Sequence, residues 1–255
     1  MGRRAAITLG VSLKLYLDIA QTARWAQAVA EIARRQPAVR SGEVALFVAP
    51  SLPALEATRA ALEGSGVAVG AQDLFWEDRG AYTGAVSGAD LRQAGAGYVE
   101  IGHAERRSVF GEDDDVIRRK FAAAVRNGLT PVLCVGEPAR DGDAAAVCVA
   151  QLSSALEGLA AGTVVDELVV AYEPVWAIGA QEPAPPDEVR TVGRALREAV
   201  AADDRVAAAS VIYGGSAQPG QLRQLGGDVD GLFLGRFAHD PAQLERVVEE
   251  AAALL

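Results

Sequence analysis

One stretch of the sequence joins an apolar run to a carboxylate, a rigid proline and a glycine. The run 168–172 has the composition of a buried strand and leads directly into Glu173. Pro174 fixes its own φ and restricts the residue before it, whereas Gly179 allows backbone angles that other residues avoid. We interpret the stretch as a base at a strand end, followed by a hinged lid. An ordinary loop with a solvated glutamate is the alternative.

Two further polar residues follow other predicted strands. His103 comes after a strand and Gly102, close to a helix start, where the helix dipole favours a neutral ring that donates a hydrogen bond. Lys14 follows the first strand, and the chain has only one other lysine, Lys120. An ammonium group at that place can stabilise a developing oxyanion. A structural histidine and a solvated surface lysine are the alternatives.

Glycine-rich turns follow the last two predicted strands. Gly214, Gly215 and Ser216 come after one strand, and Gly235 and Arg236 come after the next. Backbone N–H groups in such turns bind oxyanions, and a phosphate site after the seventh and eighth strands is a recurrent feature of barrels. We therefore predict a phosphate site here, which amides can form even in a protein of net charge -10. Plain turns and an outward-pointing arginine are the alternatives.

The carboxylate, imidazole, ammonium and phosphate site together suit one kind of reaction, the removal of a proton next to a carbonyl in a small phosphorylated sugar. Glu173 would take the proton, and Lys14 and His103 would polarise the carbonyl and stabilise the enediolate. The lid would exclude water and protect the intermediate. This chemistry requires no cofactor and no metal.

The elements that must position these residues alternate along the whole chain. We predict strands near residues 6–9, 44–49, 67–71, 98–101, 130–135, 168–172, 208–213 and 231–234. Helical patterns follow near 19–35, after Pro53, and near 89–94, 115–127, 145–159, 187–201, 218–224 and 241–253. Eight such units predict an α/β fold, a single (β/α)8 barrel domain over residues 1–255, with the strand ends on one face. A doubly wound open sheet is the alternative, although no G-x-G-x-x-G motif follows the first strand.

Composition limits the other possibilities. The 255 residues are 50% hydrophobic, which is enough for one large core. The net charge of -10 argues against nucleic acid and anionic membrane surfaces as partners. Cys134 and Cys148 lack metal or disulfide spacing, and we expect Cys134 to be buried. The start, residues 1–4, reads as no signal peptide, and no stretch is long enough to span a bilayer, so we expect a cytoplasmic protein.

Several motifs, in their order along the whole chain, resemble the triosephosphate isomerase family. They are Gly-Ala-Gln at 70–72, Gly-Ala-Tyr-Thr-Gly at 80–84, Ile-Gly-His-Ala-Glu-Arg-Arg at 101–107, Tyr-Glu-Pro-Val-Trp-Ala-Ile-Gly at 172–179 and Tyr-Gly-Gly-Ser at 213–216. The family is an established example of a neutral catalytic histidine and a closing loop. The resemblance implies interconversion of D-glyceraldehyde 3-phosphate and dihydroxyacetone phosphate, with Glu173 as base, His103 as electrophile and Lys14 as electrostatic stabiliser.

The same resemblance implies roles for residues around this centre. Glu105 would support Lys14, and the amides of Gly179, Ser216 and Gly235 would bind phosphate. The loop around Thr83 would insert into a partner subunit. A homodimer is therefore expected.

The chain departs from the family pattern at positions close to the substrate. Ser12 replaces the usual asparagine, and Arg236 replaces the second glycine of a pair. These two changes and the stretch around Trp76 are similar to a paralogue, L-erythrulose-1-phosphate isomerase, whose substrate has one more hydroxymethyl carbon. We expect a triose phosphate as the substrate and keep the tetrulose phosphate as the alternative. A non-catalytic sugar-phosphate sensor is the remaining alternative.

Overall fold

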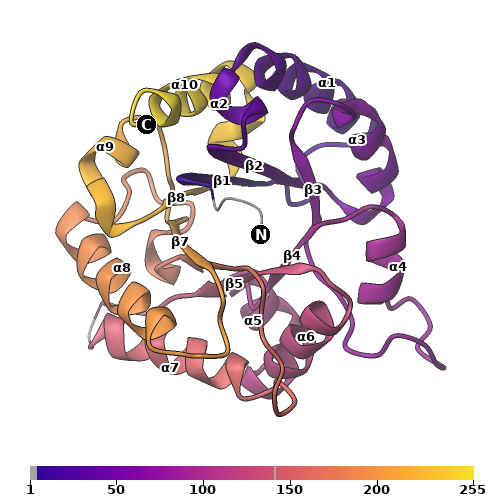
Figure 1. Ribbon diagram of the computed structural model, residues 1–255, viewed down its shortest axis with the longest axis vertical. Helices are drawn as coiled ribbons and strands as arrows, with labels where there is room; N and C mark the ends of the chain where they lie inside the picture. Colours follow the sequence, from indigo (N-terminus) through magenta and orange to yellow (C-terminus); the bar gives the residue numbers. More distant parts are fainter. Residues whose placement is uncertain (1–4, 141) are drawn as a thin grey trace.

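Eight parallel strands close into a barrel, and helices form a ring around it (Figure 1). The computed structural model describes residues 5–140 and 142–255. The start of the chain, residues 1–4, which does not read as a signal peptide, lies outside the described residues. The strands are β1 (Ile7–Ser12), β2 (Val44–Ala49), β3 (Ala68–Ala71), β4 (Tyr98–Ile101), β5 (Thr130–Val135), β6 (Leu168–Tyr172), β7 (Ala209–Tyr213) and β8 (Gly231–Leu234).

The helices lie between successive strands and pack on the outside of the barrel. They are α1 (Ile19–Arg35), α2 (Pro37–Arg40), α3 (Leu55–Leu62), α4 (Gly88–Gln93), α5 (Ala104–Phe110), α6 (Asp114–Arg126), α7 (Ala144–Leu156), α8 (Pro186–Ala201), α9 (Gln221–Leu225) and α10 (Pro241–Ala252). Short 3-10 turns are η1 (Leu52–Ala54), η2 (Val175–Ala177), η3 (Gly226–Asp228) and η4 (Arg236–His239). None of the helices in the described part of the chain is long and apolar enough to cross a bilayer.

Pairing between the first and last strands closes the sheet. Residues 8–11 of β1 pair in parallel with residues 231–234 of β8, and every other strand pairs with its neighbours in sequence order. The predicted single-domain (β/α)8 barrel is therefore confirmed, and the doubly wound open sheet is excluded. Because all strands run in the same direction, their carboxyl ends lie on one face of the barrel.

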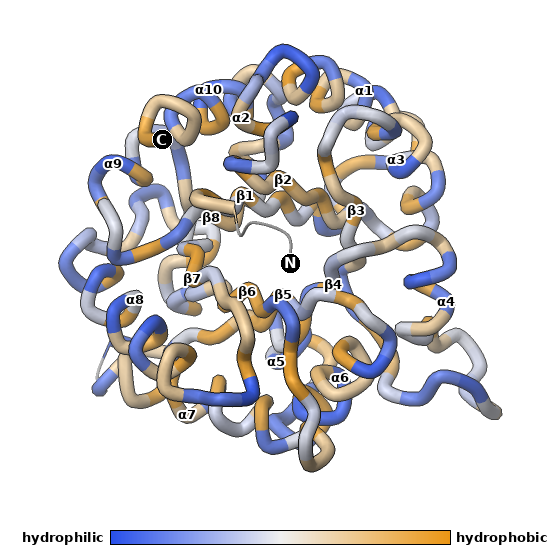
Figure 2. The backbone as a smooth tube through the Cα atoms, viewed as in Figure 1, coloured by the Kyte–Doolittle hydropathy of each residue, from blue (hydrophilic) through white to orange (hydrophobic). Residues whose placement is uncertain are grey.

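The alternation of side chains along each strand produces two cores. Inside the barrel, one cluster contains Phe47, Val132, Cys134, Val169, Ala171, Ile212 and Phe233. Between the strands and helices lies a second, larger cluster, to which α1 contributes Ala26, Val29 and Ala33, all fully buried at the predicted helical period. In Figure 2 hydrophilic residues lie mostly on the outer side of the helical ring. Cys134 is 2% exposed, which confirms its predicted burial.

The first strand is longer than predicted, and this changes the place of one site residue. Strand β1 continues to Ser12, which was expected after the strand and is instead its last, buried residue. Gly10 does not end the strand. A Cβ there would lie 2.3 Å from Phe47 and 2.7 Å from Phe233, so glycine is needed inside the narrow barrel. For helix α5 the sequence indicated only a start near His103 and no range, because its seven residues, about two turns, include no buried residue.

We expect Gly231→Ala to destabilise the fold where β8 meets β1. A Cβ at Gly231 would lie 1.7 Å from the backbone oxygen of Thr8. Such an overlap requires the backbone to move, so the free energy of unfolding should fall by at least about 3 kcal/mol, the upper end for overpacking. Thermal unfolding followed by circular dichroism measures the loss. Gly227→Ala is the control, since a Cβ there meets nothing within 4 Å. Equal melting temperatures for the two variants would contradict the prediction.

Candidate active site

Side chains from the carboxyl ends of three strands meet on one face of the barrel. Glu173 directly follows β6 and is 6% exposed. His103 follows β4, and its Nε2 lies 3.5 Å from Glu173 Oε2. Lys14 lies just after β1 and borders the same cavity. The structure therefore brings together the three residues that the sequence singled out for proton transfer.

Local backbone geometry points Lys14 into the site. Its φ of 49° is in the left-handed region, which is uncommon outside glycine. Gln72 donates from Nε2 to the carbonyl oxygens of Lys14 and Ala49, 3.0 Å away in each case, and so holds this turn. Lys14 Nζ donates to Glu105 Oε1 at 2.6 Å. Burial opposes the charged form, but this bond and the charge of Glu105 outweigh it and raise the pKa of Lys14. The ammonium is therefore held in its charged form.

The position of His103 at the start of α5 decides which ring nitrogen faces Glu173. His103 is the residue that caps this helix, and its Nδ1 accepts a hydrogen bond from the backbone N–H of Glu105 at 3.1 Å. A nitrogen that accepts such a bond carries no proton, so the neutral ring has its proton on Nε2. That N–H points to the side where Glu173 lies.

The first half of the lid is held by a buried carboxylate that sequence reasoning missed. Glu137 accepts hydrogen bonds from Trp176 Nε1 at 2.7 Å and from the Tyr172 hydroxyl at 3.2 Å. Trp176 lies in η2, two residues beyond Pro174. A signal for Glu137 was present in the sequence, because a Gly-Glu-Pro turn follows β5 as Glu173-Pro174 follows β6.

The second half of the lid is held from β7 and the turn after it. The Ser216 hydroxyl donates to the carbonyl oxygen of Ala177 at 2.8 Å. The Tyr213 hydroxyl accepts from the backbone N–H of Ala184 at 2.9 Å. Gly179, between these two points, has a φ of 74°, a backbone conformation that favours glycine. The lid is thus fastened at both ends over the site.

The glycines after β7 and β8 differ in what they contact. A Cβ on Gly214 would lie 2.6 Å from Glu173 Cγ, so this glycine makes room for the base. The carbonyl oxygen of Gly215 accepts from the Tyr213 hydroxyl, and Gly215 does not line the cavity. Ser216 has a φ of 57° and does line it, as does Gly235 at the start of η4. Phosphate binding by these residues stays a prediction.

Two cavities lie beside the candidate catalytic side chains. The first, which we call the lid cavity, has a volume of about 590 Å³ and is bordered by Ser12, Glu173, Gly179, Ser216, Gly235 and Arg236, among others. The second, which we call the rim cavity, has a volume of about 890 Å³ and is bordered by residues such as Gln72, Trp76, Glu100, Phe110 and Lys120. Lys14, Tyr16, His103 and Glu105 border both. The two cavities therefore adjoin each other at these four residues.

Arg236 is directed toward the lid and not away from the site. Its Nη2 lies 3.8 Å from the place where a Cβ on Gly179 would stand. Its guanidinium carbon is 5.8 Å from the centroid of the Tyr16 ring, within the range of a cation–π contact. Tyr16 in turn lies 5.3 Å, centroid to centroid, from the His239 ring. An arginine in this place adds a positive charge beside the predicted phosphate amides.

An ion-pair network forms the polar wall of the rim cavity. Lys120 is 3% exposed, and its Nζ contacts Asp73 Oδ1 at 2.5 Å and Glu112 Oε1 at 2.6 Å. Arg106 also pairs with both carboxylates. Because these charges neutralise one another, we assign the network to structure. No group of three or more His, Cys, Asp or Glu side chains among the described residues is arranged to hold a metal ion.

A second acidic residue inside the site was missed by sequence reasoning. Glu100, on β4, is 4% exposed. It is coupled electrostatically to Glu173 and Lys14 and is hydrogen-bonded to Ser12. The period of two places Glu100 on the same face of the strand as Tyr98, but the sequence does not show that this face points inward.

Comparison with known proteins agrees with this geometry. The family model for triosephosphate isomerase matches residues 7–251. An L-erythrulose-1-phosphate isomerase of Pectobacterium atrosepticum is 50% identical over 250 residues, 97% of this chain and 96% of the relative. A triosephosphate isomerase of Moorella thermoacetica is 41% identical over 220 residues, 84% of this chain and 88% of the relative. An L-erythrulose-1-phosphate isomerase of Rhizobium etli is 39% identical over 239 residues, 91% and 87% of the two chains.

Fold, site geometry and relatives lead to the same assignment. A barrel with its polar residues at the strand ends is matched over nearly its whole length by one family. The relatives are phosphosugar isomerases by name, and the chain aligns with most of their length. The chain therefore belongs to the triosephosphate isomerase family and is a phosphosugar isomerase.

Proposed function

We propose that this enzyme moves a carbonyl group between neighbouring carbons of a small ketose phosphate through an enediolate, with Glu173 as the base. The observation that carries the proposal is the Glu173 carboxylate, buried and 3.5 Å from His103 Nε2. Its Oε2 accepts no hydrogen bond from the described residues, so it is free to take a proton from a substrate carbon. A carboxylate within reach of the substrate carbon is the group that general-base catalysis requires.

His103 and Lys14 supply the hydrogen-bond donors that stabilise the negative charge of the enediolate. The His103 Nε2–H and the Lys14 ammonium donate to the substrate oxygens that carry the enediolate charge. Glu105 acts through Lys14, because its 2.6 Å bond keeps the ammonium charged and fixed. Donors that are already in place need no rearrangement as charge develops, and this lowers the barrier.

The phosphate group is proposed to lie in the lid cavity. Gly179, Ser216 and Gly235 all border this cavity, and their backbone N–H groups are the proposed phosphate donors. Arg236 adds a cation at its edge, beside Gly179. Together they hold a dianion in a protein of net charge -10 without a metal or another cofactor.

We favour a four-carbon ketose phosphate, L-erythrulose 1-phosphate, as the substrate. Support comes from the relative of that name, which is 50% identical to this chain over almost the full length of both. The buried Ser12 also leaves more room beside the reacting carbons than the larger asparagine typical of triosephosphate isomerases. A triose phosphate is the second candidate, supported by relatives named triosephosphate isomerase that are about two-fifths identical to this chain.

We also propose that the active enzyme is a homodimer formed through the rim cavity. Large apolar side chains are exposed around it: Leu15 is 87% exposed, Phe110 64% and Tyr16 54%. Apolar groups gathered in this way mark protein contact surfaces. The loop between β3 and α4, which carries the exposed Thr83, extends outward from the ring of helices (Figure 1) and fits the role of an inserting element.

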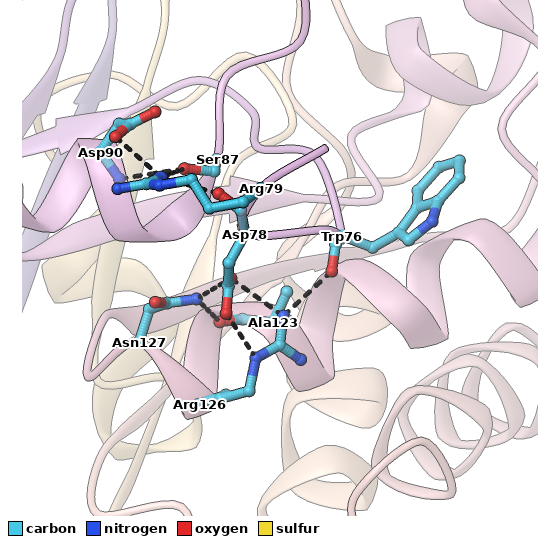
Figure 3. A network of polar contacts seen from close by, with 8 residues as sticks. All are labelled: Trp76, Asp78, Arg79, Ser87, Asp90, Ala123, Arg126 and Asn127. Atoms are coloured by element: carbon cyan, nitrogen blue, oxygen red, sulfur yellow. Dashed lines mark hydrogen bonds and ion pairs between the residues drawn. The ribbon is translucent and has the colours of Figure 1, made fainter. Parts of the chain in front are cut away.

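Hydrogen bonds and an ion pair hold both ends of this loop in place. Arg126 and Asn127, at the end of α6, donate to Asp78, and Arg126 also donates to the carbonyl oxygen of Trp76 (Figure 3). On the other side of the loop, Arg79 donates to the Ser87 hydroxyl and pairs with Asp90 in α4. The tip around Thr83 is therefore presented on a fixed base.

We expect Glu173→Gln to lower kcat by about 10²–10⁴-fold, since the amide cannot accept the proton. The change keeps the size of the side chain, and the predicted phosphate site is separate. The inhibition constant for inorganic phosphate should therefore stay within about threefold of the wild-type value. Steady-state kinetics on one substrate with phosphate as inhibitor measures both quantities. Turnover comparable to the wild type would show that Glu173 is not the base.

The substrate is tested by kcat/KM for L-erythrulose 1-phosphate and for D-glyceraldehyde 3-phosphate on one preparation. We expect the tetrulose phosphate to be preferred by at least about tenfold, in the range that one pocket group provides. The Glu173→Gln protein, purified in the same way, controls for isomerases carried over from the expression host. A tenfold preference for the triose phosphate would instead identify a triosephosphate isomerase.

Sedimentation velocity at micromolar concentration should give a dimer. We expect Phe110→Asp to shift it to a monomer, because a charge in a buried apolar contact is costly. Val164→Asp is the matched control, since Val164 is 50% exposed and does not border the rim cavity. A monomeric wild-type protein, or a Phe110→Asp protein that remains dimeric, would contradict this interface.

A further inference from the structure

One buried carboxyl group in the site has no part in the proton transfer described above. Glu100 Oε1 is buried and accepts no hydrogen bond from the described part of the chain, although Glu100 borders the rim cavity. Glu112 also buries a free oxygen, but its charge is balanced by Lys120 and Arg106. Among the described residues, Glu100 forms no ion pair, and the charge of Lys14 acts on it only without such a contact. An unpartnered polar oxygen is costly in a buried site, so its retention calls for a ligand.

The position of Glu100 aims it at the reacting groups. Tyr98, two residues earlier on β4, faces the barrel interior and stacks on Phe47 with 4.5 Å between ring centroids. Because alternate residues of a strand share a face, Glu100 also points inward, nearer the carboxyl end where the site lies. There it is hydrogen-bonded to Ser12, the last residue of β1, and its charge is coupled to those of Glu173 and Lys14.

The surroundings of Glu100 favour the neutral acid. Burial holds the pKa of the Glu100 carboxyl well above its usual range, and the charge of Glu173 acts in the same direction. The hydrogen bond from Ser12 and the charge of Lys14 oppose this without cancelling it. A neutral acid does not repel the base, and it offers both an O–H donor and a carbonyl acceptor, the two functions that bind a hydroxyl group.

The two cavities show which end of a substrate reaches Glu100. The predicted phosphate amides border the lid cavity, whereas Glu100 borders the rim cavity. His103 and Lys14 border both, at the junction. A sugar phosphate held by its phosphate in the lid cavity, with its reacting carbons at the junction, therefore directs any further carbon toward Glu100.

We propose that Glu100, together with Ser12, binds the hydroxyl group on the carbon beyond the reacting pair and so selects a four-carbon over a three-carbon ketose phosphate. The inference rests on the isomerase function proposed above and names the residues that set its substrate. A triose phosphate has no hydroxyl group at that place and leaves the Glu100 oxygen unpaired. Sites that hydrogen-bond a substrate hydroxyl reject analogues without it far more strongly than apolar pockets do.

The test is the ratio of kcat/KM for L-erythrulose 1-phosphate to kcat/KM for D-glyceraldehyde 3-phosphate. We expect Glu100→Leu to lower this ratio by at least about 100-fold, because a buried apolar group cannot pair with the extra hydroxyl. Glu100→Gln keeps a donor and an acceptor of similar size and should restore the ratio to within about tenfold of wild type. A ratio between substrates is not moved by a general loss of folded enzyme.

Thr8→Val is the matched control. Thr8 is also buried inside the barrel on β1, where its hydroxyl lies 3.2 Å from that of Ser210, and it does not border either cavity. Its ratio should equal that of the wild type. Should Glu100→Leu not fold, Ser12→Ala removes the other member of the pair with little change in volume and should lower the ratio by at least about tenfold.

The outcomes separate the two proposals. A wild-type enzyme that acts on the triose phosphate alone, or variants that lower both rates in proportion, would overturn the role of Glu100 and leave the isomerase function standing. A wild-type enzyme that acts on neither sugar would overturn the proposed function itself.

Discussion

The closure of the sheet is the constraint on which the rest of the molecule depends. The pairing of β1 with β8 leaves an interior so narrow that Gly10 must lie opposite Phe47 and Phe233. Once the barrel is closed, eight strands end on one face, and each can place a side chain there. Lys14, His103 and Glu173 are 70 or more residues apart in sequence, and only this closure brings them to one cavity.

Negative charge is a second constraint on the site, because three glutamates lie close together in a protein that is already acidic. Each is handled differently. Glu105 is paired with Lys14, Glu173 lies next to a neutral histidine, and the surroundings of Glu100 favour its protonated form. One carboxylate can then act as a base because the other two do not add an unbalanced negative charge beside it. At the other end of the lid cavity, Arg236 lies beside Gly179, where phosphate binding is proposed.

Unusual backbone conformations and the hydrogen bonds that hold them lie around the candidate active site. The two non-glycine residues with a positive φ in the described chain, Lys14 and Ser216, both border the lid cavity. Such conformations persist only where neighbours hold them, as Gln72 does for the Lys14 turn. Glu137 and Tyr213 hold the two ends of the lid through hydrogen bonds to Trp176 and Ala184.

The amino-acid sequence by itself determined the fold and identified the candidate reacting groups. Strand and helix periodicity repeated eight times, and strong local signals such as Glu173-Pro174 and Gly102-His103 marked the strand ends. It did not determine what faces the barrel interior. Gly10 looked like a strand end, and Glu100 looked like an ordinary strand residue, because the period of two along a strand does not say which face is inside. The hydrogen bond of Glu137 with Trp176 and the contact of Arg236 with Tyr16 likewise join segments that are far apart in the chain. Tertiary structure decided these residues, since burial and electrostatic coupling exist only once the barrel has closed.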